Sequence, residues 1–194
     1  LELAMMGRLT SRAPKDVPIT REHIEKARTG GHKSKALRSR SADGESASPP
    51  ELKDYWSWAP IADLLVALLD FRGRTPKKLG MDWGGDIPAL SALNVRPERI
   101  DLSRTKHFGS VQLYEKWMTR GDAERGDVVL TMEAPLGNVA QIPDDRRYIL
   151  SQRVVLLKPK RELVLDGFLA WCLRGPASQE WLTTQETGTT ARGI

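Results

Sequence analysis

Four basic side chains fall within seven consecutive positions of the sequence: Arg72, Arg74, Lys77 and Lys78. Gly73 and Pro76 in the same stretch predict an exposed, stiff loop. Lys and Arg on such a loop can follow the phosphates of a nucleic-acid backbone, and each neutralised phosphate makes binding more salt-dependent. A solvated loop without a ligand is the alternative. We expect the four cations to contact phosphates.

Gln152 and Arg153 are polar residues within an apolar run that predicts a strand. Because side chains alternate between the two faces of a strand, one of them should point out of the sheet. Gln is suited to the edge of adenine and Arg to the edge of guanine. Both are therefore candidate base contacts, with a buried hydrogen bond to a neighbouring loop as the alternative.

A third polar group follows the last expected helix, at Thr189, Thr190 and Arg192. Gly188 is suited to end that helix in the left-handed conformation. Hydroxyls and backbone N–H groups beyond it can grip a phosphate, with Arg192 beside them. We expect this group to bind DNA as well.

The sequence lacks the short motifs that carry common enzyme chemistries. It has no Gly-x-Gly-x-x-Gly, no phosphate-binding Gly-Lys-Ser/Thr loop and no Gly-x-Ser-x-Gly turn. Its three histidines (His23, His32 and His107) are far apart, which gives no metal-ligand spacing. Residues 48–51 (SPPE) share two prolines with the signature of amino-group methyltransferases but lack its amine acceptor and its aromatic ring. We expect no catalytic site, cofactor or metal.

Two carboxylates, Asp127 and Glu133, share one expected strand and would face the same side of it. No further residue marks a sugar or acyl site near them. General acid–base catalysis is therefore not expected from this pair.

The basic excess is concentrated near the start of the chain. The formal net charge is +5, and residues 1–50 hold 10 Lys and Arg against 6 acids, whereas residues 51–194 hold 20 against 19. The polar, basic segment 11–50 predicts a flexible linker. Since the remainder is nearly neutral, binding of nucleic acid requires cations gathered on one face.

Cys172 is the single cysteine, so no disulfide can form within the chain. The sequence shows no secretory leader and no apolar run of about 18 residues. These features favour a cytoplasmic protein. Because the chain begins with Leu1 rather than Met, we expect it to be cut from a longer one.

The candidate residues need a folded scaffold, which we expect to begin near Trp56. After Pro60, apolar residues recur with helical spacing, which predicts a helix over residues 61–68. A surface loop should lead to a buried strand over residues 87–95, interrupted by Pro88. Ser110 is expected to cap a helix that stops at Gly121.

The second half of the scaffold should contain a hairpin, a strand and two helices. Residues 127–133 and 138–142 predict the two strands of the hairpin, with Pro135 and Gly137 shaping its turn. Residues 148–157 predict one further strand. Helices are expected from Asp166 or Gly167 to Arg174, and from Pro176 to Glu186. The fold class is therefore mixed α/β (α+β).

Five segments in this order resemble a target recognition domain of the specificity subunits of Type I restriction-modification systems: Asp70–Lys78, Ile87–Val95, Gly126–Ala140, Leu150–Arg153 and Thr187–Thr190. The resemblance implies a single domain over residues 51–194. Residues 1–10 look like the end of a spacer helix, and residues 11–50 like the linker that leads to a second recognition domain. The chain stops where the family would begin its second spacer helix.

What the resemblance implies is a non-catalytic subunit that reads one half of a bipartite target in double-stranded DNA. Methylation subunits and a restriction (translocase/nuclease) subunit would be its partners, and the complete complex would be a methyltransferase and an ATP-dependent endonuclease. Leu93 and Met132 replace the Lys and Arg that many relatives carry, so these two sites cannot contact phosphates. The alternatives are the recognition domain of a fused restriction-methyltransferase, and a non-functional remnant that only interacts with other proteins.

Overall fold

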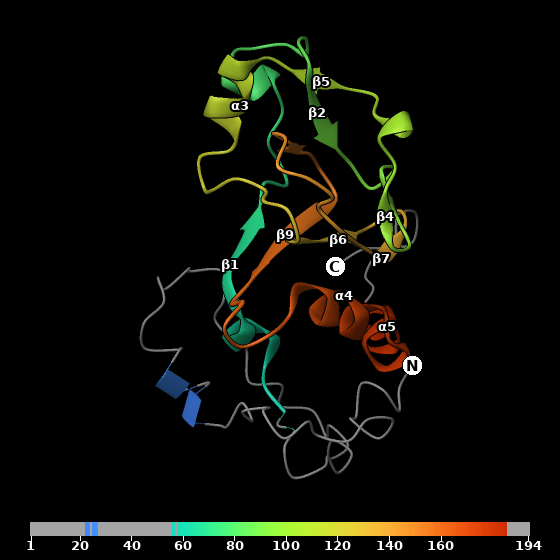
Figure 1. Ribbon diagram of the computed structural model, residues 1–194. Helices are drawn as coiled ribbons and strands as arrows, with labels where there is room; N and C mark the ends of the chain where they lie inside the picture. Colours follow the sequence, from blue (N-terminus) through green and yellow to red (C-terminus); the bar gives the residue numbers. More distant parts are fainter. Residues whose placement is uncertain (1–21, 24, 27–55, 57, 186–194) are drawn as a thin grey trace.

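The computed structural model describes residues 22, 23, 25, 26, 56 and 58–185 (Figure 1). Of the expected linker 11–50, it describes Glu22, His23, Glu25 and Lys26, which are helical and exposed. The expected end of a spacer helix (residues 1–10) and the candidates Thr189, Thr190 and Arg192 lie outside the described residues.

A four-stranded antiparallel sheet, in the order β1-β9-β6-β7, forms the centre of the fold (Figure 1). Its strands are β1 (Leu65–Asp70), β6 (Val128–Met132), β7 (Leu136–Gln141) and β9 (Val154–Pro159). The predicted hairpin is confirmed as β6 and β7. Gly137, which was expected to shape the turn, lies instead within β7, where its φ of 86° accompanies a register irregularity in the pairing with β6.

Alternate residues of the central sheet serve two apolar cores on its opposite faces. On β9, Val154 and Leu156 belong to the first core, and Val155 and Leu157 to the second. The first core includes residues of α3 (Val111–Trp117), and the second includes residues of α4 (Asp166–Arg174). The central sheet is thus the middle of three layers (Figure 1).

Two small sheets complete the layer on the first face, and the described residues also contain three short 3-10 helices. One sheet has the order β5-β2-β8, with β2 (Ile87–Leu90) antiparallel to β5 (Phe108–Gly109) and parallel to β8 (Ile149–Leu150). The other pairs β3 (Val95–Arg96) with β4 (Arg99–Ile100). The 3-10 helices are η2 (Ile61–Leu64), which leads into β1, η3 (Lys77–Leu79) and η4 (Leu102–Arg104). This mixture confirms the α+β class.

The three helices predicted after residue 110 are confirmed, but α3 ends at Trp117 and not at the expected Gly121. Ser110 caps α3, because its Oγ accepts a hydrogen bond from the backbone N–H of Leu113 at 3.1 Å. The helix after α4 is α5 (Pro176–Thr184), which starts at the expected proline and ends two residues early. Within the described ranges, no helix is long and apolar enough to cross a membrane.

The helix predicted over residues 61–68 is wrong. A 3-10 turn, η2, occupies its start, and β1 begins at Leu65. The apolar run from Leu64 to Leu69 is short, and such a run fits a strand as well as a helix. Its antiparallel pairing with Val155–Pro159 of β9 makes this run a strand.

Two strand predictions need correction. The strand over residues 148–157 is divided into β8 and β9 by a turn at residues 151–153, and the strand over residues 87–95 into β2 and β3 by a turn at residues 91–94. Gln152 and Arg153 therefore lie in a turn, and not on a strand. Arg153 has a φ of 73°, a left-handed conformation that no regular strand contains.

Candidate nucleic-acid interface

An open groove of about 430 Å³ lies where β2 and β8 end. Its walls come from separate segments of the chain: the loop after β1, the residues after β2, the residues before β5 and the turn at 151–153. Three of the sequence-predicted DNA contacts line it: Arg74, Gln152 and Arg153. Arg72, Lys77 and Lys78 are exposed near by in the sequence but do not line the groove.

The parallel pairing of β2 and β8 brings the groove's two central turns together. Ala89 lies opposite Ile149 and Leu90 opposite Leu150, so both strands run toward the same edge. The backbone N–H of Ser151 continues the ladder by donating to the carbonyl of Leu90 at 2.8 Å. The turns at 91–94 and 151–153 therefore leave the sheet side by side.

A fully buried asparagine fixes the first turn. Asn94 accepts hydrogen bonds from the backbone N–H and the hydroxyl of Ser91, at 2.9 and 3.0 Å. Its amide nitrogen donates to Thr105 Oγ1 at 3.0 Å and to the carbonyl of Asp101 at 3.2 Å. With the turn held from within, Leu93 stays 39% exposed at the groove.

Glu133 and Arg74 restrain the second turn. Arg153 Nε lies 2.9 Å from Glu133 Oε1, and the carbonyl of Arg153 accepts from the backbone N–H of Met132 at 2.8 Å. The amide nitrogen of Gln152 lies 3.5 Å from the carbonyl of Arg74. Gln152 is exposed, so the rest of its amide is open to a ligand.

Arg74 is anchored to the end of α3. Its guanidinium donates to the carbonyls of Trp117 and Lys116, the latter at 3.2 Å, and to Thr119 Oγ1 at 3.0 Å. It also lies over the ring of Phe71, 5.3 Å from the centroid. These bonds occupy much of its donor capacity and fix the loop that forms one wall of the groove.

Two other cations of the predicted cluster, Arg72 and Lys78, have local partners. Arg72 forms an ion pair of 2.9 Å with Asp70, and Lys78 Nζ donates to the carbonyl of Gly73 at 2.7 Å. Burial alone would raise the pKa of Asp70, but the hydrogen bonds and charge of Arg72 hold it below 3.8. The loop thus keeps its shape through its own contacts.

Sequence reasoning missed three groove residues: Trp83, Lys106 and His107. The rings of Trp83 and His107 are stacked, with centroids 5.0 Å apart and planes at 14°. Lys106 is exposed beside them. Lys106 and His107 precede a strand of two residues, β5, which is too short to produce a periodic pattern in the sequence.

The groove is basic at its rim and apolar at its floor. Arg74, Lys106 and Arg153 supply cations, and no Asp or Glu is among the described residues that line it. Ala89 and Ala92, both buried, form part of the floor. Such a surface can hold an anionic backbone at its rim while its polar side chains meet the edge of a flat group.

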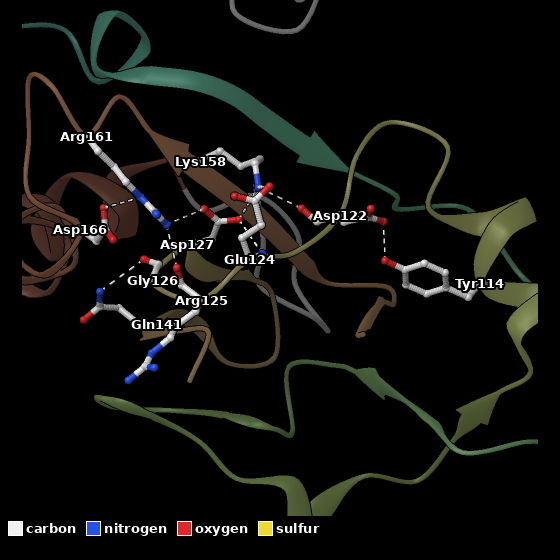
Figure 2. Close-up of polar contacts among 10 residues, drawn as sticks. All are labelled: Tyr114, Asp122, Glu124, Arg125, Gly126, Asp127, Gln141, Lys158, Arg161 and Asp166. Atoms are coloured by element: carbon white, nitrogen blue, oxygen red, sulfur yellow. Dashed lines mark hydrogen bonds and ion pairs between the residues drawn. The ribbon is translucent and has the colours of Figure 1, made fainter. Parts of the chain in front are cut away.

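A second polar cluster has a structural role (Figure 2). Asp127 is 2% exposed, and Lys158 Nζ lies 2.6 Å from its Oδ2 and 3.1 Å from Glu124 Oε1. Burial raises the pKa of Asp127 above 3.8, and the ammonium of Lys158 offsets part of this effect. Arg161 extends the cluster to Asp166 of α4, at 3.3 Å.

Asp127 and Glu133 do not come together as a catalytic pair. Asp127 belongs to the cluster around Lys158, whereas Glu133 pairs with Arg153 at the groove. In the part of the chain that the structure describes, no group of three His, Cys, Asp or Glu residues is placed to hold a metal ion.

No protein-family model matches the chain, and no curated protein matches its sequence. Among solved structures, it is similar to a Type I restriction-modification system S subunit from M. genitalium, with 14% identity and a TM-score of 0.44. The similarity covers 69% of this chain and 29% of that protein, so the chain spans less than a third of the length of the S subunit.

Proposed function

We propose that the chain is a non-catalytic module that reads double-stranded DNA, with the groove between the turns at 91–94 and 151–153 as its binding surface. The observation that carries this proposal is the composition of the groove. It unites Arg74, Gln152 and Arg153 with Lys106 and contains no carboxylate among its described lining residues. Phosphate contacts position a protein on DNA, and contacts to base edges specify the sequence.

Lys106 and Arg153 are the proposed phosphate contacts of the groove, and Gln152 is the proposed base contact. Arg74 adds its charge from an anchored position. Arg72, Lys77 and Lys78 would extend phosphate binding along the exposed loop, and Thr189, Thr190 and Arg192 would add to it. Positions that interact with phosphates are expected to contribute similarly on every duplex.

In this proposal the module reads one half of a bipartite target within a Type I specificity subunit. The order of the five sequence segments that resemble such a domain supports this reading. Methylation subunits and a restriction subunit would be the partners, and ATP, Mg²⁺ and S-adenosylmethionine would be bound by them. The chain itself is not an enzyme in this proposal.

Salt dependence provides the test. The double variant Lys106→Ala/Arg153→Ala should weaken binding to all duplexes similarly. The slope of log K against log salt should become shallower by about 0.9 per lost contact, hence by roughly 2 for the pair. Binding of labelled duplexes to the full chain is measured from low to moderate salt.

The matched control is Arg99→Ala/Arg125→Ala, which removes the same charge at exposed positions outside the groove lining. It should leave the slope nearly unchanged. Equal slopes for the two double variants, with circular dichroism showing both folded, would remove the groove from the interface. Absence of duplex binding by the unaltered chain would favour a remnant that only interacts with other proteins.

A further inference from the structure

We infer that the groove reads an A·T base pair through its major-groove edge, with Gln152 on the adenine and Leu93 on the methyl group of the thymine. This inference rests on the proposed DNA-reading function and names the base pair that one part of the groove takes.

The two side chains share the groove because of the sheet topology. Leu93 belongs to the turn that follows β2, and Gln152 to the turn that follows β8. These strands are parallel neighbours, so the two turns start at the same edge, and both residues line the groove. An amide and an aliphatic side chain are thus presented together to one ligand.

The amide of Gln152 is restrained in a way that favours adenine over guanine. One N–H of its amide group is directed to the carbonyl of Arg74, 3.5 Å from the nitrogen. One N–H donor and the carbonyl acceptor then remain for a ligand. Adenine offers an acceptor at N7 and a donor at N6, which match this pair, whereas guanine offers two acceptors.

Arg153 has donors that would suit guanine, but its guanidinium is already paired with Glu133, and the proposed function assigns it to a phosphate. The Nε of Arg153 lies 2.9 Å from Oε1 of Glu133, a carboxylate that is not among the residues lining the groove. Of Gln152 and Arg153, Gln152 is therefore the side chain with both a donor and an acceptor available.

Leu93 offers an apolar contact for the methyl group of the thymine in the pair. Thymine carries a C5-methyl group at its major-groove edge, and cytosine carries none. Leu93 is 39% exposed, and its neighbour Ala92 is buried in the apolar floor. A methyl group placed against Leu93 loses water contact, which is favourable, whereas the amino group of cytosine would find no acceptor on this side chain.

The first part of the test is selection of duplexes from a random pool by the full chain. Binders of the unaltered protein should share an A·T pair at one position. That pair should become degenerate in binders of Gln152→Ala, and on the selected duplex this variant should bind roughly 5- to 150-fold more weakly.

The second part uses modified bases at the position identified. Deoxyuridine in place of thymidine removes the methyl group and should weaken binding about fourfold. Leu93→Ala should abolish this sensitivity. Leu165→Ala, which truncates an exposed leucine outside the groove lining, should retain it. 7-Deazaadenine should weaken binding of the unaltered protein and leave Gln152→Ala unaffected.

A G·C pair at the Gln152-dependent position would overturn the inference, as would equal affinity for thymidine and deoxyuridine in the unaltered protein. Either result would leave the DNA-reading function intact, because selected duplexes would still exist. If no duplex is enriched and binding shows no salt dependence, the proposed function itself fails.

Discussion

Asp127 and Lys158 form a buried ion pair whose two members are unequal. The carboxylate is 2% exposed, while the side chain of the lysine is 16% exposed and also donates to the carbonyl of Asp122 at 3.0 Å. Lys158→Met should leave the carboxylate buried without its nearest cation and lower the free energy of unfolding by about 3–5 kcal/mol at pH 7. Urea unfolding measures this loss.

The loss should shrink in acid. Burial already raises the pKa of Asp127 above its unfolded value of 3.8, and removal of the ammonium raises it further. A folded-state pKa above the unfolded one means that stability falls as the pH rises through the window above 3.8. The deficit should therefore be largest at neutral pH. A deficit that does not vary between pH 7 and pH 4 would show that lost packing, and not the carboxylate charge, is the cause.

Some residues of the candidate site could be predicted from their type and position in the sequence, and others could not. Arg74, Gln152 and Arg153 were identified by residue type and do line one groove. Lys106 and His107 were missed because they precede a strand of two residues, where no pattern marks them. The bonds of Arg74 to the end of α3 were also invisible, since they join residues more than forty positions apart.

Among the elements, the wall of the groove that carries Trp83 depends on a close approach of two backbone segments. A Cβ on Gly85 would lie 2.6 Å from the carbonyl oxygen of Gly109, and Gly85 has a φ of 118°. Gly85→Ala should therefore displace this segment from β5 and cost more stability than the roughly 1 kcal/mol expected for an unfavourable φ alone. Thermal unfolding compares the variants.

Gly73→Ala is the control for this prediction. Gly73 has a φ of 83°, but a Cβ there would meet nothing within 4 Å. Gly73→Ala should lose stability through its unfavourable φ but should cause no steric clash. Equal losses for the two variants would show that the contact between Gly85 and Gly109 is loose.

Secondary structure was predictable where a local signal was sufficient. The cap at Ser110, the proline that opens α5 and the two strands of the hairpin each follow from neighbouring residues. The segment from Leu64 to Leu69 was misassigned because six apolar residues fit either periodicity, and β9, the partner of this segment, lies about ninety positions away. The pairing of β1 with a strand so distant in the sequence cannot be recognised from local residue patterns.

For the whole molecule, the alternation along β9 couples the two cores. Leu156 belongs to the core on the side of α3, and Leu157 to the core on the side of α4. Leu156→Ala and Leu157→Ala should each lower the free energy of unfolding by about 2–5 kcal/mol. Because one strand supports both layers, both variants should unfold in a single transition, with tryptophan fluorescence and circular dichroism coincident.

A biphasic curve for Leu157→Ala would instead mean that the layer of α4 and α5 melts independently. The sequence predicted the α+β class of this molecule but not its layers. The order β1-β9-β6-β7 and the parallel pair β2 and β8 depend on which segments meet in space, and the same set of strands is compatible with several orders.

The pairing of β2 with β8 affects which residues of the protein can be substituted during evolution. The two turns beyond these strands are held by their own hydrogen bonds and by the buried Asn94, so exposed side chains such as Leu93 and Gln152 can be exchanged without disturbing either core. Substitutions at such exposed positions usually change the free energy of unfolding very little. Under the proposed function, a few codon changes at these positions would alter which ligand the groove binds while the scaffold stays the same.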